Sequence, residues 1–119
     1  MAFTDYKDLD VWKVSIDLTC ETYNLIKRLP KEEQYSLADQ MRRAVVSIPS
    51  NIAEGRGRQS DTEFAHYLYI AKGSCYELET QIIICEKLNY LNENECERVF
   101  ELTNKVSRML ANLIKTLKR

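Results

Sequence analysis

Polar side chains that could support chemistry repeat at helical spacing in the middle of the chain. Ser47, Asn51 and Glu54 are separated by four and three residues, so they share one face of a helix. A hydroxyl and a carboxylate beside a histidine could form a hydrolytic site, and the chain has one histidine, His66. His66 is separated from Glu54 by more than ten residues and a predicted loop. We therefore expect no catalytic residue, no cofactor and no enzymatic activity.

The same polar residues have a structural interpretation. Gly73, Ser74 and Glu77 form a matching small and polar patch on the next predicted helix, where a glycine allows close backbone approach. We predict a buried or half-buried hydrogen-bonded network between the two helices. Its members are Ser47, Asn51, Glu54, Gly73, Ser74 and Glu77.

Any basic binding site must be confined to part of the chain, because the whole chain has a net charge of -1, from 17 Lys and Arg against 18 Asp and Glu. This balance lacks the basic excess that is common in nucleic-acid-binding proteins. Between residues 42 and 58, however, four arginines face one glutamate. Two of these, Arg56 and Arg58, precede the N-terminus of a predicted helix, where free N–H groups favour an anion. The predicted phosphate contacts are Arg42, Arg43, Arg56 and Arg58.

Two other interpretations of the charges stay open. Arg43 could pair with Glu54 or Glu77 across the predicted network. Six basic residues against one acidic residue at positions 98–119 could complement the dipole of the last helix instead of binding phosphate.

Composition favours a cytoplasmic, helical protein with one domain over residues 1–119. The chain is 45% hydrophobic and has only 3 Gly and 2 Pro, which leaves few turns for a β-rich fold. The first residues lack the charged and apolar regions expected of a signal peptide, and no apolar run approaches the length of a membrane span. The 4 cysteines lack metal-binding spacing, so we expect reduced structural thiols and no metal.

Four amphipathic blocks predict an all-α fold. The blocks cover residues 8–28, residues 31–55, a third segment from Ser60 and a fourth from Asn92, and short loops join them. Such a pattern favours an antiparallel up-down-up-down four-helix bundle. Gly55 is predicted to cap the second helix, and Pro49 to kink or loosen it. The predicted core faces are Leu9, Trp12, Ile16, Cys20 and Tyr23; Leu37, Met41, Ala44, Val45, Ile48 and Ile52; Phe64, Leu68, Ala71, Cys75, Leu78 and Ile82; and Val99, Val106, Leu110, Leu113 and Leu117.

Three of the four predicted helices carry a second apolar stripe away from the core face. A short chain cannot cover both sides of its helices, so the second stripes predict a homo-oligomer. Scattered surface hydrophobic residues are the alternative explanation. The predicted interface residues are Val11, Val14, Leu18 and Leu25; Val46, Pro49 and Ala53; and Ile70 and Ile84, next to Tyr69, Tyr76 and Ile83.

Several motifs resemble those of the 23S rRNA intervening-sequence proteins, a family of bacterial four-helix-bundle proteins. They are SIPSNIAEG at 47–55, QMRRA at 40–44, DLDVW at 8–12, and the Gly-Ser-x-x-Glu-Leu of residues 73–78. The resemblance implies a left-handed bundle assembled as a homopentameric ring, in a family whose biochemical role is not established. The family is also similar to the accessory variability determinant of diversity-generating retroelements, which favours nucleic-acid binding by analogy of fold.

These observations predict a non-enzymatic oligomeric bundle that binds structured RNA or a nucleoprotein partner. The main rival is a protein-binding scaffold without nucleic-acid affinity. A nuclease or other enzyme is a distant third hypothesis. No membrane and no small-molecule substrate are expected as partners.

Overall fold

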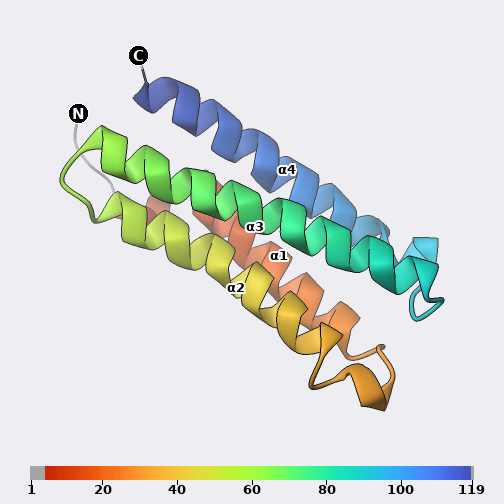
Figure 1. Cartoon of the computed structure of the whole chain (residues 1–119). Coiled ribbons are helices and arrows are strands. Elements are labelled where there is room, and N and C mark those ends of the chain that lie inside the picture. The colour runs from red at the N-terminus through yellow and green to blue at the C-terminus, as the bar shows by residue number, and fades with distance from the viewer. Residues whose placement is uncertain (1–4, 119) are drawn as a thin grey trace.

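The computed structural model describes residues 5–118, and Figure 1 shows their long helices lying alongside one another. The described residues form helices and turns and contain no strand, so the all-α prediction is confirmed. The long helices are α1 (Asp10–Ile26), α2 (Leu37–Arg56), α3 (Asp61–Lys87) and α4 (Glu93–Leu117), and two short 3-10 helices are η1 (Tyr6–Asp8) and η2 (Lys31–Glu33). α1 and α3 each pack against both α2 and α4, in a molecule of 47 × 23 × 19 Å.

The core faces predicted for the second and third helices are confirmed, since every residue predicted for them is buried. On α4, Val99, Val106 and Leu110 are buried, and Leu113 and Leu117 are partly buried against the core. Burial of each large aliphatic side chain stabilises the fold by about 1.5–3 kcal/mol. Among residues 5–118, no helix combines the length and the apolar character needed to cross a bilayer.

The core face predicted for the first helix is wrong except at its start, where Leu9 and Trp12 are partly buried against the core. Two of its residues, Cys20 and Tyr23, are exposed. Ser15 and Thr22 lie on the true core face, and each donates its hydroxyl hydrogen to a carbonyl of its own helix at 2.7 Å. Because these hydroxyls are satisfied within the helix, their burial leaves no unpaired donor. The buried residues of α1 are Val11, Ser15, Leu18, Thr22, Leu25 and Ile26.

α2 begins and ends later than predicted. Its first helical residue is Leu37, after the short η2, and its helical structure runs unbroken through Pro49 to Arg56. The C-terminal cap is Gly57, whose backbone N–H donates to the carbonyl of Ala53 at 3.3 Å. The prediction that Gly55 caps this helix is therefore wrong.

Gly55 instead lets α2 and α3 approach closely. A Cβ atom added at Gly55 would lie 2.6 Å from the Cβ of Tyr67 and 3.1 Å from Cδ1 of Phe64. The Tyr67 Cβ is attached directly to the backbone of α3, so a rotamer change cannot relieve the first contact. The glycine of the SIPSNIAEG segment is thus required by helix packing.

Side chains cap the starts of α3 and α4. Ser60 Oγ accepts from the Glu63 N–H at 3.1 Å at the start of α3. At the start of α4, Asn92 Oδ1 accepts from the Glu95 N–H, and Glu95 Oε1 accepts from the Asn92 N–H, both at 2.9 Å. The second pair is a complete capping box, which fixes where α4 begins.

Side chains link the α1–α2 and α3–α4 connections, which lie at the same end of the bundle. Arg28 donates to Glu95 at 2.9 Å, and the Tyr90 hydroxyl donates to Glu33 at 2.9 Å. The hydrogen bond to Glu33 raises the pKa of Tyr90. The backbone N–H of Asn92, followed by Arg28, lowers the pKa of Glu95. These contacts hold the α1–α2 and α3–α4 connections together.

Candidate functional site

The predicted polar network has one direct link between α2 and α3. Ser47 Oγ and Ser74 Oγ lie 2.5 Å apart. Ser47 Oγ also lies 2.8 Å from the Ala44 carbonyl, and Ser74 Oγ lies 3.2 Å from the Ile70 carbonyl. Each hydroxyl has one hydrogen, so one serine donates to its own helix while the other donates across the seam. The SIPSNIAEG segment thus joins the two helices through a serine pair.

Among the described residues, the other predicted members add no second hydrogen bond between α2 and α3. Asn51 Nδ2 donates to the Ser47 carbonyl within α2 at 2.7 Å, and Glu54 forms an ion pair with Arg58 at 3.0 Å. Glu77 is exposed and has no hydrogen-bond partner within residues 5–118. Gly73 is also exposed, and an added Cβ there would meet nothing within 4 Å. The network is therefore a serine link with separate polar residues around it.

One buried polar group of this seam escaped the sequence analysis. Gln81 lies seven residues after Ser74, on the same side of α3, and is only 4% exposed. Its Oε1 atom is buried without a hydrogen-bond partner among the described residues. Glutamine is common on exposed helix faces, so its residue type gave no signal of burial.

The four predicted phosphate-binding arginines do not form one site. Arg42 lies 14 residues before Arg56 on α2, which corresponds to about 20 Å along a helix. Arg42 donates to Asp39 at 2.7 Å and to the side chain of Gln34 at 2.9 Å, so it holds the start of α2 in place. Arg43 is exposed, without a partner in the described part of the chain. Arg42 and Arg43 therefore lie too far from the α2–α3 junction to share a phosphate site with Arg56 and Arg58.

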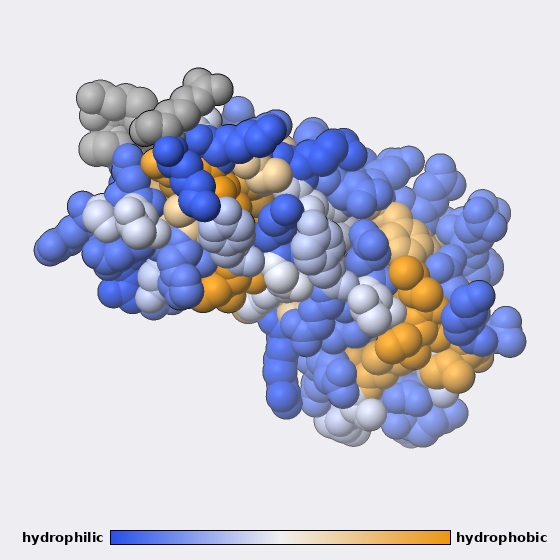
Figure 2. All heavy atoms as spheres, turned by 45° about the horizontal axis from the view of Figure 1, so that its top comes forward, coloured by the Kyte–Doolittle hydropathy of each residue, from blue (hydrophilic) through white to orange (hydrophobic). Residues whose placement is uncertain are grey.

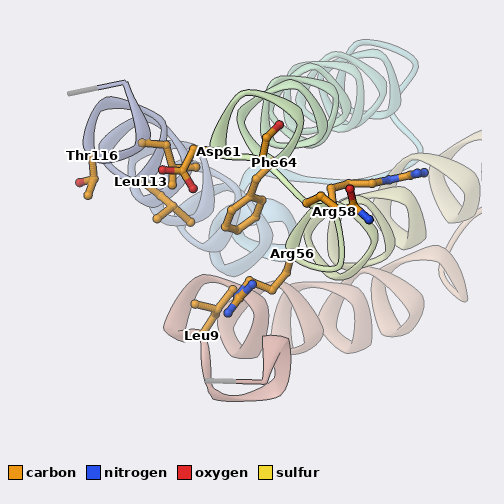
Figure 3. Close-up of a pocket in the computed structure, with 10 residues that line it drawn as sticks. Leu9, Arg56, Arg58, Asp61, Phe64, Leu113 and Thr116 are labelled. Carbon is orange, nitrogen blue, oxygen red and sulfur yellow. The ribbon is translucent and has the colours of Figure 1, made fainter. Parts of the chain in front are cut away.

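Arg56 and Arg58 do lie together at the α2–α3 junction, beside a hollow of about 280 Å³. Leu9 of α1's N-terminal flank, Phe64 of α3 and Leu113 of α4 also line it, so all four long helices meet here (Figure 3). Arg56 reaches toward Leu9, whereas Arg58 points the other way (Figure 3). The two guanidinium groups thus face different sides of one end of the bundle.

Arg58 is held in a defined position at the surface. Its Nη2 atom donates to Glu54 Oε1 at 3.0 Å and to the Tyr67 hydroxyl at 2.5 Å. The guanidinium carbon also lies 4.8 Å from the centre of the Tyr67 ring. Its side chain remains 41% exposed. A positioned, accessible guanidinium can still form charged hydrogen bonds with a phosphate.

Part of the predicted oligomer interface belongs to the core of the chain itself. Val11, Leu18 and Leu25 are at most 4% exposed, so a second copy cannot contact them, and this part of the prediction is wrong. Val14 is half-buried against the same core. The error follows from the exchanged faces of α1.

The remaining predicted interface residues lie at the surface of the chain or just beneath it. Pro49 is buried, but with half-buried Ala53 and exposed Val46 it lines a hollow of about 320 Å³ between α1 and α2. Ile70 and Ile84 are each 41% exposed on α3. Figure 2 shows apolar surface in separate areas toward both ends of the molecule.

The second apolar stripe predicted on α3 is in fact two stripes. At 100° per residue, Ile70 and Ile84 lie with Ser74 on the α2 side of the helix. Tyr69 and Tyr76 lie on the α4 side, and Lys118 of α4 is over the Tyr69 ring at 5.2 Å. The two stripes differ in chemistry, since one is aliphatic and the other is aromatic and flanked by lysine.

Three cysteines are buried free thiols, namely Cys75, Cys85 and Cys96, and Cys20 is exposed. Burial raises the pKa of Cys75 to about 12, that of Cys85 to about 11 and that of Cys96 to about 12. These thiols stay protonated at neutral pH and behave as small apolar side chains.

The described residues contain no group of three or more His, Cys, Asp or Glu side chains arranged to hold a metal ion. One Glu-x-x-His pair, Glu63 and His66, does occur at the start of α3, where both residues are exposed. Ser60 Oγ lies 3.3 Å from the Glu63 carboxylate, so this glutamate belongs to the helix cap.

Comparison with known proteins gives a family and a fold. The family model described as 23S rRNA-intervening sequence protein matches residues 7–112. A crystal structure of a protein with unknown function from the S23 ribosomal protein family of Bacteroides thetaiotaomicron is similar, with a TM-score of 0.82 and 24% sequence identity. The similarity covers 88% of this chain and 98% of that chain. No curated protein matches.

Proposed function

Because this chain belongs to the 23S rRNA-intervening sequence protein family, we propose that it is a non-enzymatic, self-associating bundle that binds structured RNA. The proposal takes the fold as a left-handed, antiparallel up-down-up-down bundle and the assembly as a homopentameric ring. It places the protein in the cytoplasm, where RNA is available and free thiols such as Cys75 persist.

The observation that carries the proposal is the exposed aliphatic surface beside the α2–α3 seam. Ile70 and Ile84 are each 41% exposed there, and Val46 is equally exposed on the α1 side of α2. Gly73 lies on the outer side of the same helix as Ile70, with open space where a side chain would be. Large apolar residues around a glycine suit a second helix that packs closely against α3. We take this surface to contact another copy of the chain.

The RNA contact is assigned to Arg56 and Arg58 at the α2–α3 junction. Both precede the N-terminus of α3, where backbone N–H groups favour an anion. One subunit offers few charges, but a ring repeats them, so weak sites act together on a long RNA. Repetition would let a chain with a net charge of -1 hold RNA while ignoring short duplexes.

The proposal assigns no catalytic role to the polar residues. Ser47 bonds to Ser74, and Glu54 pairs with Arg58, so both candidate groups have structural partners. A nuclease would instead show metal-dependent turnover that Glu54→Gln abolishes. We expect wild-type protein and Glu54→Gln to leave labelled RNA equally intact with and without Mg²⁺.

A salt titration with a long structured RNA tests the RNA contact. Affinity should fall with salt, because phosphates that bind the protein release counterions. The logarithm of the binding constant should fall linearly with the logarithm of the salt concentration, by about 0.9 per phosphate contact for a B-form duplex. Arg56→Ala with Arg58→Ala should weaken binding and flatten this slope. Arg98→Ala with Lys105→Ala removes the same charge from exposed positions of α4 and should change binding less.

A salt-independent interaction that the arginine pair does not affect would contradict RNA binding. That result would favour the second candidate function, a protein-binding scaffold, which the exposed Val46, Ile70 and Ile84 also suit.

Light scattering tests self-association separately. We expect a mass several times the 13.9 kDa of one chain, and five times for the ring. Ile70→Lys with Ile84→Lys should shift the protein toward the monomer, because burying lysine at an apolar contact is costly. Wild-type protein that stays monomeric at micromolar concentration would refute assembly.

A further inference from the structure

The α4 side of α3 presents two accessible aromatic rings. Tyr69 and Tyr76 are 48% and 55% exposed. They are seven residues apart, so they project from the same side of the helix about 10 Å from each other.

Each ring has a lysine ammonium beside it. Lys118 Nζ lies 5.2 Å from the centre of the Tyr69 ring, and Lys72 Nζ lies 5.6 Å from the centre of the Tyr76 ring. Arg108 and Lys115 are also exposed on α4, the helix that packs beside this side of α3. Aromatic rings interleaved with cations are what single-stranded nucleic acid requires, because bases stack on the rings and phosphates meet the cations.

A hollow of about 430 Å³ adjoins the first ring, lined by Tyr69, His66 and Lys118 among others. Asp61 also lines it and contributes one carboxylate. Asp61 and Leu117 line the hollow beside Arg56 and Arg58 as well. The aromatic surface and the arginine pair therefore belong to the same end of the bundle.

Negative charge ends the aromatic surface toward the C-terminal end of α3. Ile83 continues the stripe seven residues beyond Tyr76 and is 42% exposed. Farther along, Glu86 of α3 and Glu93, Glu97 and Glu101 of α4 line a hollow of about 500 Å³. These carboxylates would repel a phosphate chain, so a bound strand would end near Tyr76.

We propose that Tyr69 and Tyr76, with Lys118 and Lys72, bind a single-stranded segment of nucleic acid by base stacking. The proposal rests on the RNA-binding function proposed above and specifies that the bound segment is single-stranded. A duplex keeps its base faces stacked internally, so it cannot use these rings. A protein partner would instead use the continuous apolar stripe, including Ile83.

Fluorescence anisotropy with a labelled 12-nucleotide oligo(U) tests this site at fixed low salt. Tyr69→Ala with Tyr76→Ala should weaken binding about tenfold or more, because stacking contributes to each bound base. Tyr69→Phe with Tyr76→Phe keeps the rings and should bind as the wild type does. Tyr35→Ala, at a tyrosine that is 92% exposed elsewhere, and Ile83→Ala should have little effect. Circular dichroism checks that every variant keeps its helicity.

Three results would overturn the proposal. They are unchanged affinity in the double alanine variant, equal affinity for the same oligonucleotide in a duplex, and an equally large loss in Ile83→Ala, which points to a protein-docking surface. A parallel titration with oligo(dT) reports whether RNA is preferred over DNA. Structured-RNA binding that depends on Arg56 and Arg58 but not on the tyrosines would leave the proposed function intact and refute only the stacking site.

Discussion

Gly55 and Gly73 provide a matched pair of glycine-to-alanine tests with opposite expected signs. At Gly55 the new Cβ would lie 2.6 Å from the Tyr67 Cβ, so α2 and α3 must move apart. Overpacking of this kind costs about 2–3 kcal/mol, and the better helix propensity of alanine offsets about 1 kcal/mol. We therefore expect Gly55→Ala to lower the free energy of unfolding by about 1–2 kcal/mol, measured by urea denaturation.

Gly73→Ala should stabilise the isolated chain instead. Nothing lies within 4 Å of its added Cβ, so only the helix propensity term remains, worth about 0.5–1 kcal/mol. The unfolding measurements need a concentration at which both variants have the same association state, since assembly adds to apparent stability. At higher concentration Gly73→Ala should associate less, because the methyl group occupies the proposed contact. A Gly55→Ala protein as stable as the wild type, or a destabilised Gly73→Ala chain, would refute the packing argument.

Three further predictions concern the seam, the thiols and the acid limit of stability. Ser47→Ala should lower the free energy of unfolding by about 1 kcal/mol in urea denaturation, because the link to Ser74 is lost; no change would count against that link. A thiol reagent should modify Cys20 quickly in the native protein and the three buried thiols only after denaturant is added, whereas four fast thiols would contradict their burial. Because the Asn92 N–H and Arg28 lower the pKa of Glu95 in the folded protein, this carboxylate stabilises the fold at neutral pH, and that stabilisation is lost as the pH falls through the lowered pKa. In thermal melts Glu95→Gln should thus be less stable than the wild type near neutral pH, and the difference should shrink in acid; a difference that grows in acid would reverse this reasoning.

The helices and most of the core could be predicted from apolar spacing, but the orientation of α1 could not. Its two stripes have similar apolar content, and the true core face carries Ser15 and Thr22, whose residue types suggest exposure. Only the backbone geometry shows that their hydroxyls bond to carbonyls within the helix. A helix face is misassigned in this way whenever buried polar side chains form hydrogen bonds within their own helix.

The candidate site shows the corresponding limits for charged residues. Helical spacing correctly indicated that Ser47 and Ser74 could meet, since both lie on polar sides of neighbouring helices. Helical spacing could not show that Arg42 donates hydrogen bonds to Asp39 and Gln34, because Gln34 belongs to the turn before α2. It also merged the two stripes of α3, whose separate environments depend on which helix packs on each side.

Recovery of the protein from its native host tests the central claim most directly. The protein should be isolated at low salt without nuclease treatment, and the copurifying nucleic acid should be sequenced. We expect RNA that salt releases, with enrichment of transcripts that contain structured regions, and a marked loss of that RNA from the Arg56→Ala with Arg58→Ala variant. Protein that carries no RNA, or that carries the same RNA after both arginines are removed, would contradict the account.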